Sequence, residues 1–312
     1  MTPGEPAAVL AAYDGSPAAQ AALRAVGALM GDAGVTVLTV HRAPFGLDRL
    51  RGDGRDAAEQ LARGVMDDVR ATAEEGARLA AEAGLRADPV VVDARGRIAS
   101  AIIASAREHG ADLIAMGTRG RGGFARSLLG STASSVLHHA ERPVLVVPDG
   151  AGELSGPAVV AYDGSEEARA AIAAVGRLLA GRPVVVVHAW ESTIRHTLSG
   201  KALGAAPVAD VREITGELEE MFAEGAQRMV DEGVALAGEA GLDATGDPYE
   251  SGSGAWRAIA AAARAQGAAV LVVGSHGHGR AGSVLLGSVS SGLVHNAEVP
   301  TLVVPAGGEA GT

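Results

Sequence analysis

Two segments of the chain share a glycine spacing that suits them to bind an anion. The shared pattern is Gly, two residues, Gly, nine residues and then Gly-Ser, and its members are Gly117, Gly120, Gly130 and Ser131, and then Gly274, Gly277, Gly287 and Ser288. Glycine permits positive φ angles and carries no Cβ that would obstruct a ligand approaching the backbone. Successive N–H groups of such a loop can form an anion-binding nest, and a helix that begins at the final serine adds free N–H groups and a favourable dipole. The pattern therefore predicts a phosphate site in each segment.

The same glycines could instead make tight turns that bind nothing. The segments are not Walker loops, because no Gly-Lys-Ser/Thr follows, and they are not dinucleotide fingerprints, which belong after a first strand. The spacing is identical in both copies, whereas the residues between the glycines differ freely, as in RGRGGFARS and HGHGRAGS. This duplication favours the binding interpretation over the turn interpretation.

The tetrapeptide YDGS ends the first expected strand of each half, at residues 13–16 and 162–165. Its serine has the position of a helix N-cap, and the aspartate could simply assist that cap. In open α/β sheets, however, ligands bind at the carboxyl ends of strands where the strand order reverses. If the first and fourth strands are neighbours, Asp14 and Asp163 face the glycine loops. A carboxylate there can accept a hydrogen bond from an adenine amine or a ribose hydroxyl.

The chain repeats itself, which defines its domain organisation. AVLAAYDGSPAAQAAL returns as AVVAYDGSEEARAAI, and each half ends in a similar strand, PVLVVP or PTLVVP. Asp163 follows Asp14 by 149 positions and Gly274 follows Gly117 by 157, so the second half carries a net insertion of about eight residues, expected around residues 192–210. We expect two domains, at residues 1–150 and 156–312, joined by the linker DGAGELSG.

Each half alternates apolar strand patterns with helical patterns, which predicts α/β domains with parallel sheets. The fold class expected is two tandem doubly wound domains, each a five-stranded parallel sheet in the order 3-2-1-4-5 with helices on both faces. The expected strands of the first half lie near residues 8–13, 35–41, 88–92, 112–117 and 143–147.

Composition limits the functional classes. The net charge of −11 argues against nucleic-acid binding, which requires phosphate neutralisation. The absence of cysteine excludes disulfides and thiolate chemistry. No stretch reaches the roughly 20 apolar residues of a membrane helix, and the apolar run at the N-terminus stops at Asp14, too early for a signal peptide. His276 and His278 have no carboxylate near them in the loop, so no metal site is expected.

The YDGS strand ends, the second strand ending in histidine, and the MGTRG…LLGS pattern resemble the universal stress protein family, in its ATP-binding branch. The resemblance covers nearly the whole chain, twice. It implies that the aspartate and the backbone just after the second strand contact the base, that the first glycine lies by the ribose, and that the later glycines, the serine and the next residue hold the phosphates. The implied residues are Asp14, Arg42, Gly117, Gly120, Gly130, Ser131 and Thr132, and then Asp163, Ala189, Gly274, Gly277, Gly287, Ser288 and Val289. Arg42 is bulkier than the small apolar residue usual at its position.

The resemblance implies a cytoplasmic stress-response regulator in which bound ATP, with Mg²⁺, alters conformation or the binding of protein partners not yet known. The alternative is a slow ATP hydrolase or nucleotidyl transferase on the same fold. The sequence has no obvious general base repeated near the two loops, which argues against this alternative. A pure interaction scaffold is a third possibility. The apolar last strands lie at expected sheet edges, which need cover. We therefore expect the halves to form an intramolecular pseudo-dimer through these strands, which leaves open a further homodimer.

Overall fold

The computed structural model describes residues 6–42, 53–94, 96–120, 129–191, 208–252, 254–277, 286–296 and 298–305, without the side chains of 53–59, 191 and 208–215. The chain divides into two compact units, one of Met1–Leu154 with Val294–Thr312 and one of Ser155–Leu293. The expected insertion falls almost wholly on residues 192–207, which lie outside the described residues.

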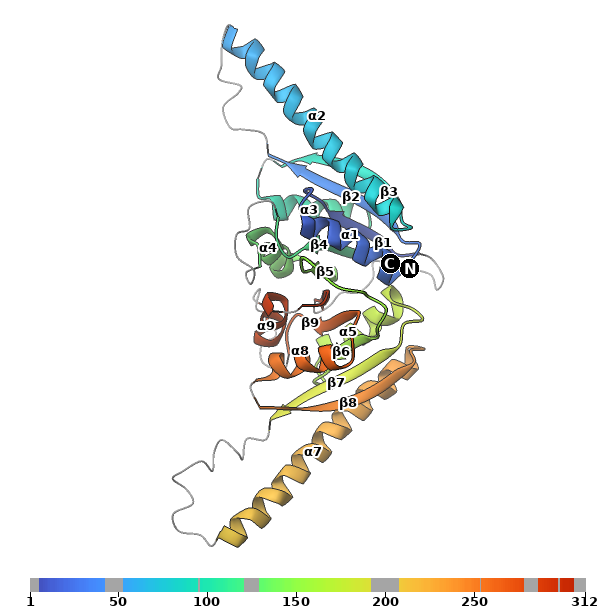
Figure 1. The fold of residues 1–312 in the computed structure, drawn as a ribbon, viewed down its shortest axis with the longest axis vertical. Helices are drawn as coiled ribbons and strands as arrows, with labels where there is room; N and C mark the ends of the chain where they lie inside the picture. The colour runs from blue at the N-terminus through green and yellow to red at the C-terminus, as the bar shows by residue number, and fades with distance from the viewer. Residues whose placement is uncertain are drawn as a thin grey trace. The chain divides into compact units, whose positions relative to one another are not determined.

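In the first unit, strands and helices alternate along the chain (Figure 1). Its elements in chain order are β1 (Ala8–Ala12), α1 (Pro17–Met30), β2 (Gly34–His41), α2 (Asp53–Glu82), β3 (Arg86–Asp93), α3 (Ile98–Glu108), β4 (Leu113–Gly117), α4 (Ser131–His139) and β5 (Val144–Val147). Every expected strand is present, within about two residues of its expected bounds.

The five strands of the first repeat pair in parallel in the order β3-β2-β1-β4-β5, as the sequence predicted. Every residue of β4 and β5 is buried, which suits apolar runs covered on both faces of a sheet. Helices α1 and α2 pack together against the sheet, whereas α3 packs with α4. The strand order reverses between β1 and β4, so a crevice is expected where these two strands end.

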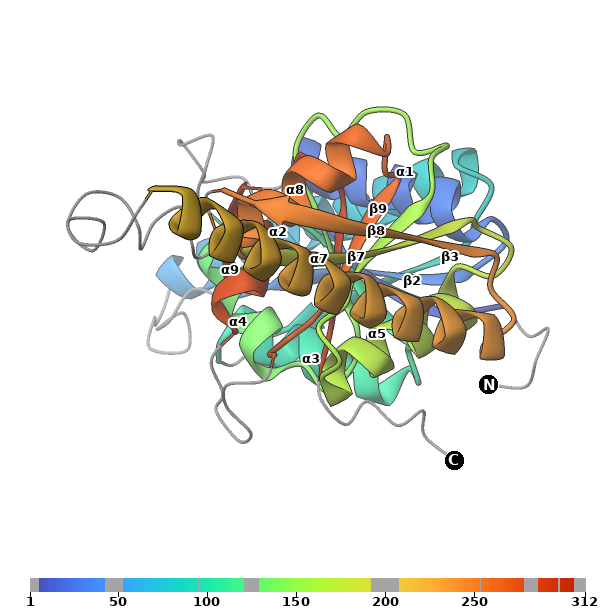
Figure 2. The same cartoon turned by 90° about the horizontal axis from the view of Figure 1, so that it is seen from below.

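The second unit repeats this arrangement, and Figure 2 shows its long helix α7 beside β7 and β8. Its elements are β6 (Ala158–Ala161), α5 (Glu166–Leu178), β7 (Val184–Glu191), α7 (Val208–Glu239), β8 (Ala244–Ser251), α8 (Ala255–Ala265), β9 (Val270–Gly274) and α9 (Ser288–Asn296), of which the last three residues belong to the first unit. Parallel pairs join β8 to β7, β7 to β6 and β6 to β9, which reproduces the first four positions of the order. Strand β6, like β1, therefore lies at a point of reversal.

The last strand of the second repeat, β10 (Thr301–Val304), belongs to the first compact unit. It pairs with β5 in antiparallel fashion, with Thr301 opposite Val146 and Val303 opposite Val144. The described sheet of the first unit thus has six strands, and its last pair departs from the purely parallel pattern expected. The apolar edge of β5 is covered by this pairing.

Candidate functional site: two crevices at the strand ends

A cavity of about 410 Å³ lies in the first unit where β1 and β4 end. Its wall contains six of the seven residues expected at the first site: Asp14, Gly117, Gly120, Gly130, Ser131 and Thr132. Apolar side chains from β2, α3 and β4 also line it: Leu38, Val40, Ile98, Ile102 and Met116. The structure therefore brings together residues that are up to 118 positions apart in the chain (Asp14 to Thr132).

The second unit has a cavity of about 580 Å³ at the equivalent place. All seven residues expected there line it: Asp163, Ala189, Gly274, Gly277, Gly287, Ser288 and Val289. Ala255 and Val273 stand where the first cavity has the larger Ile98 and Met116, in keeping with the greater volume. Both volumes fall within the range of roughly 300–1,000 Å³ that is usual for ligand pockets.

Arg42 is the exception among the expected residues. It follows β2, is exposed, and is not among the residues that line the first cavity, whereas Ala189, its counterpart, lies within β7 and lines the second. The two sites therefore differ where the backbone after the second strand was expected to meet the base.

The aspartates both assist the helix cap and face the cavity. Asp14 Oδ1 accepts from the backbone N–H of Ser16 at 3.0 Å, and the Ser16 hydroxyl accepts from Ala19 N–H at 3.3 Å, so the capping interpretation is confirmed. Asp14 Oδ2 lies on the other side, 2.5 Å from where a Cβ on Gly120 would stand. One carboxylate oxygen thus serves the turn, while the other lies against the glycine loop.

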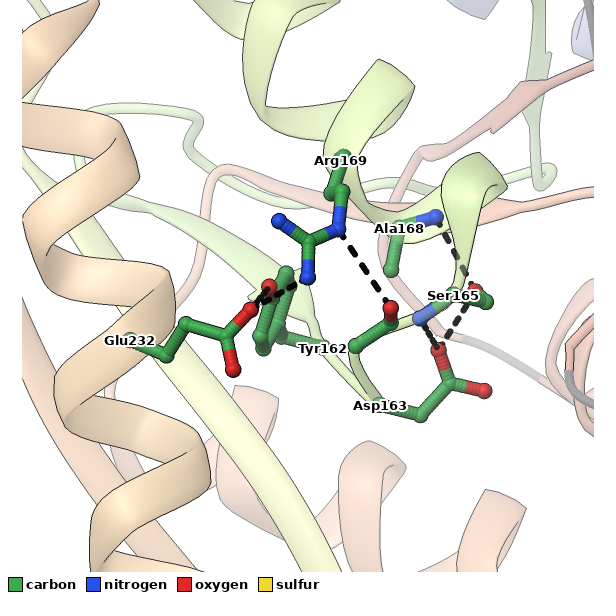
Figure 3. A network of polar contacts seen from close by, with 7 residues as sticks. Tyr162, Asp163, Ser165, Ala168, Arg169 and Glu232 are labelled. Atoms are coloured by element: carbon green, nitrogen blue, oxygen red, sulfur yellow. Dashed lines mark hydrogen bonds and ion pairs between the residues drawn. The ribbon is translucent and has the colours of Figure 1, made fainter.

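The second unit repeats this geometry with one more hydrogen bond. Asp163 Oδ1 accepts from Ser165 N–H at 3.0 Å and from the Ser165 hydroxyl at 2.5 Å, and its Oδ2 lies 2.5 Å from the place of a Cβ on Gly277. Figure 3 shows the second oxygen of Asp163 pointing away from Ser165. Gly164, whose φ is +79°, provides the left-handed turn that directs the carboxylate back toward the loop.

The first glycine of each loop is required by packing, which is a reason that sequence reasoning did not foresee. A Cβ on Gly117 would lie 2.6 Å from the carbonyl carbon and the Cβ of Ala18 in α1, and one on Gly274 would lie 2.6 Å from the Cβ of Glu167 in α5. These atoms belong to the protein and not to a ligand space. The glycine lets α1 lie close against the end of β4, and α5 against the end of β9.

The helices after the loops present their N-termini to the cavities. Gly130 is the N-cap of α4, its N–H donates to Thr118 O at 2.8 Å, and no side chain caps the helix. The first N–H of α4 with an intrahelical acceptor is that of Ser134, which donates to Gly130 O at 2.9 Å. The N–H groups of the preceding residues, which lie in the cavity wall, have no acceptor within the helix. In the second unit, Gly287 N–H donates to Ser275 O at 2.9 Å and α9 begins likewise.

A buried serine fixes the start of α9. The Ser290 hydroxyl lies 2.7 Å from Gly274 O and 3.1 Å from Ser275 O, so it ties the first turn of α9 to the end of β9. Its counterpart in the first unit is Ala133, which has no such group.

Sequence reasoning missed the apolar wall contributed by α3 and α8. Ile98, Ile102, Ala255 and Ile259 lie in the first two turns of these helices. The only available signal was their matching position after the third strand of each repeat, because no motif marks them.

Neither a metal centre nor a membrane segment is found in the part of the chain that the structure describes. No group of three or more His, Asp or Glu side chains there could hold a metal ion. None of the helices there has both the length and the apolar character needed to cross a membrane. His278, the second histidine of the loop, lies outside the described residues.

The fold and the crevices define a tandem doubly wound α/β protein with a ligand-sized cavity at each strand-order reversal. The model of the universal stress protein family matches residues 7–148 and, again, residues 156–305. The chain therefore belongs to the universal stress protein family, as two tandem domains. Membership of this family supports a role in the stress response.

Curated relatives are universal stress proteins of mycobacteria. One from Mycobacterium tuberculosis is 31% identical over 199 residues, which cover 62% of this chain and 61% of the relative. One from Mycolicibacterium smegmatis is 32% identical over 201 residues, which cover 62% of each chain. The chain thus spans less than two thirds of the length of the curated relatives that it matches.

Solved structures share the fold along almost the whole chain. A universal stress protein from Archaeoglobus fulgidus aligns with a TM-score of 0.61 at 23% identity and covers 96% of this chain and 98% of that one. A functionally unknown protein from Pseudomonas aeruginosa aligns with a TM-score of 0.57 at 15% identity and covers 96% of this chain and 92% of that one. At these identities the likeness is one of fold alone.

Proposed function

We propose that each cavity binds one ATP with Mg²⁺, and that the protein is a cytoplasmic stress-response regulator whose conformation or partner binding depends on the nucleotide. One observation carries the proposal. In both units an aspartate oxygen, the three signature glycines and the uncapped N-terminus of a helix line a cavity of ligand size. The arrangement is built twice from residues that are far apart in the sequence.

The described residues suit the parts of an adenine nucleotide. The free N–H groups at the start of α4 and α9, together with the Ser131 and Ser288 hydroxyls, are donors for phosphate oxygens, and the helix dipole favours their negative charge. Asp14 and Asp163 are acceptors for a donor on the base or the ribose. The apolar wall offers a surface for the base. Mg²⁺ would be carried on the phosphates, where it would neutralise part of their charge.

Substitution at the first residue of α4 and α9 tests the proposal without disturbing the fold. Ser131→Glu and Ser288→Glu place a carboxylate where the phosphates would lie, and a helix N-terminus stabilises such a charge. Both serines are exposed, so the longer side chain has room. Ser131→Gln and Ser288→Gln have the same size without the charge.

Titration calorimetry with ATP and Mg²⁺ should give two sites for the wild-type protein, one site for each single Glu variant and none for the double Glu variant. The Gln variants should retain both sites. If the wild-type protein binds no ATP at micromolar concentrations, the proposal is wrong.

The rate of ATP hydrolysis distinguishes a nucleotide-dependent regulator from an ATP hydrolase. Phosphoryl transfer needs a group that orients the nucleophile beside the γ-phosphate. Among the described residues that line each cavity, the acid is Asp14 in the first and Asp163 in the second, and we assign both to the base or ribose. Single-turnover hydrolysis should therefore be slow. A rate above about 1 s⁻¹, the low end for ordinary enzymes, would favour the hydrolase.

A further inference from the structure

The two units hold their aspartates differently. In the second unit, the Tyr162 hydroxyl donates to Glu232 Oε1 at 2.8 Å, and Arg169 Nη2 donates to the same oxygen at 2.5 Å (Figure 3). Arg169 Nε also lies 3.4 Å from Gly164 O, and His188 Nδ1 lies 2.7 Å from Tyr162 O. We call Tyr162, Arg169, His188 and Glu232 the Asp163 clamp.

The clamp fixes the backbone on both sides of Asp163. Tyr162, just before the aspartate, is held through its hydroxyl by Glu232 of α7 and through its carbonyl by His188 of β7. Gly164, just after it, is held by Arg169 of α5. Three elements therefore converge on the turn that carries the carboxylate. A binding group that is already held in place loses less freedom when its ligand arrives, so it binds more tightly.

The first unit has the same tyrosine and glutamate but lacks the arginine. Gln20 stands where the second unit has Arg169, and Glu75 stands where it has Glu232. The Tyr13 hydroxyl is buried close to Gln20 and Glu75, but it makes no hydrogen bond of good geometry with a described residue. The ion pair between Arg169 and Glu232 has no counterpart among the described residues of the first unit.

We propose that Arg169 and Glu232 are positioning residues of the second site, that they make it the tighter of the two nucleotide sites, and that the second site therefore fills first. This inference rests on the proposed function. Its consequence is a two-step response, in which ATP levels between the two dissociation constants load the second unit alone.

The chain provides the means to measure each site by itself. The Ser131→Glu background reports the second site and the Ser288→Glu background reports the first, both by calorimetry. Both tryptophans, Trp190 and Trp256, lie in the second half. The Trp256 ring packs so closely against Gly292 of α9 that a Cβ there would have no room. Because the N-terminus of α9 lines the second cavity, tryptophan fluorescence gives an independent signal of binding to the second unit.

Exchanging the residue types at the equivalent positions 169 and 20 tests the clamp. Arg169→Gln should raise the second-site dissociation constant for ATP about 3–10-fold, the effect of one hydrogen bond or a little more. Gln20→Arg should lower the first-site constant, because it gives Glu75 an arginine like the one that pairs with Glu232. Arg169→Lys should recover part of the second-site affinity. Arg177→Gln, at an exposed arginine of the same helix, changes the charge equally and should leave the constant unchanged.

Nucleotide selectivity distinguishes positioning from a general loss of structure or charge. If the clamp acts through Asp163, Arg169→Gln should reduce the preference of the second site for ATP over inosine triphosphate or over 2′-deoxy-ATP, whichever lacks the donor that Asp163 binds. Equal affinities of the two wild-type sites, an unchanged constant in Arg169→Gln, or unchanged selectivity against both competitors would each overturn the inference. Absence of ATP binding at both sites would instead overturn the proposed function, and the inference with it.

Discussion

At the residue scale, the aspartates show why two interpretations of one motif need not compete. The sequence allowed Asp14 to be either a capping residue or a ligand-binding residue. A carboxylate has two oxygens, and in both units Oδ1 serves the turn while Oδ2 lies against the second glycine of the loop. The capping role is confirmed by its distances, and the binding role stays a prediction that the cavity supports.

Tyr162 makes stability depend on alkaline pH. Burial, followed by the hydrogen bond to Glu232, raises the pKa of Tyr162 from 10.0 to about 12. Because the pKa is higher in the folded than in the unfolded chain, this contribution to stability is fully present below pH 10 and is lost as the pH rises toward 12. It amounts to at most about 3 kcal/mol, since one pKa unit corresponds to about 1.4 kcal/mol.

Denaturant unfolding should therefore show a free energy of unfolding that falls between pH 9 and pH 12. The expected fall is about 1–3 kcal/mol, which corresponds to a pKa difference of about one to two units. The slope should be shallower in Tyr162→Phe, which keeps the ring but has no ionisable hydroxyl. Tyr249→Phe, in β8 and outside the network, should keep the wild-type slope. Equal slopes in Tyr162→Phe and wild type would contradict this assignment.

At the scale of elements, the glycine that ends β4 or β9 governs how closely the next layer packs. Gly117→Ala would drive a Cβ to within 2.6 Å of the backbone of α1 at Ala18, a contact that only a shift of the helix can relieve. Such overpacking costs about 1–3 kcal/mol. Thermal or denaturant unfolding should show the loss in Gly117→Ala and in Gly274→Ala, even without nucleotide.

Gly34→Ala is a matched control for that loss. Gly34 begins β2, and a Cβ there meets nothing within 4 Å. Its stability should equal or exceed that of wild type, because alanine restricts the unfolded chain more than glycine does. A stable Gly117→Ala variant that merely failed to bind ATP would restore the original view, in which the glycine makes room for a ligand.

The strands and the glycines that border each loop were predictable, because strong periodicity and a duplicated spacing specify them. Apolar runs gave the strand bounds, and the spacing from Gly117 to Ser131 located the cavity wall. The contribution of Ile98 and Ala255 was not predictable, since the side chains differ between the repeats and meet the cavity only through folding. The Asp163 clamp was not predictable either, because Arg169 and Glu232 lie 63 positions apart in two different helices and meet only through folding.

At the scale of the whole molecule, the sequence repeat and the compact unit do not coincide. The family match of the second repeat runs from residue 156 to residue 305, but the second compact unit ends at Leu293. Strand β10 belongs to the first unit, where it pairs with β5. An apolar edge strand needs cover, and a strand from the other repeat supplies it. The wider expectation of a pseudo-dimer of two domains stays a prediction.

The register of β5 and β10 leads to a prediction that cysteine crosslinking can check. Val144 lies opposite Val303, and Val146 lies opposite Thr301. Directly opposed side chains in antiparallel strands have Cβ atoms about 4.5–5.5 Å apart, close to disulfide reach, whereas diagonal neighbours are about 7–8 Å apart. The chain has no cysteine, so engineered thiols have no competitors.

Oxidation of Val144→Cys/Val303→Cys and of Val146→Cys/Thr301→Cys should therefore give an intramolecular disulfide, detected as faster migration without reductant and as a linked peptide by mass spectrometry. The diagonal variant Val146→Cys/Val303→Cys is the control and should crosslink poorly. Because the bond would close a loop of more than 150 residues, it should also increase the free energy of unfolding, by on the order of 4 kcal/mol if it forms without strain. The midpoint of unfolding should rise accordingly. Efficient crosslinking of the diagonal pair and none of the opposed pairs would mean that β10 pairs with β5 in another register or not at all.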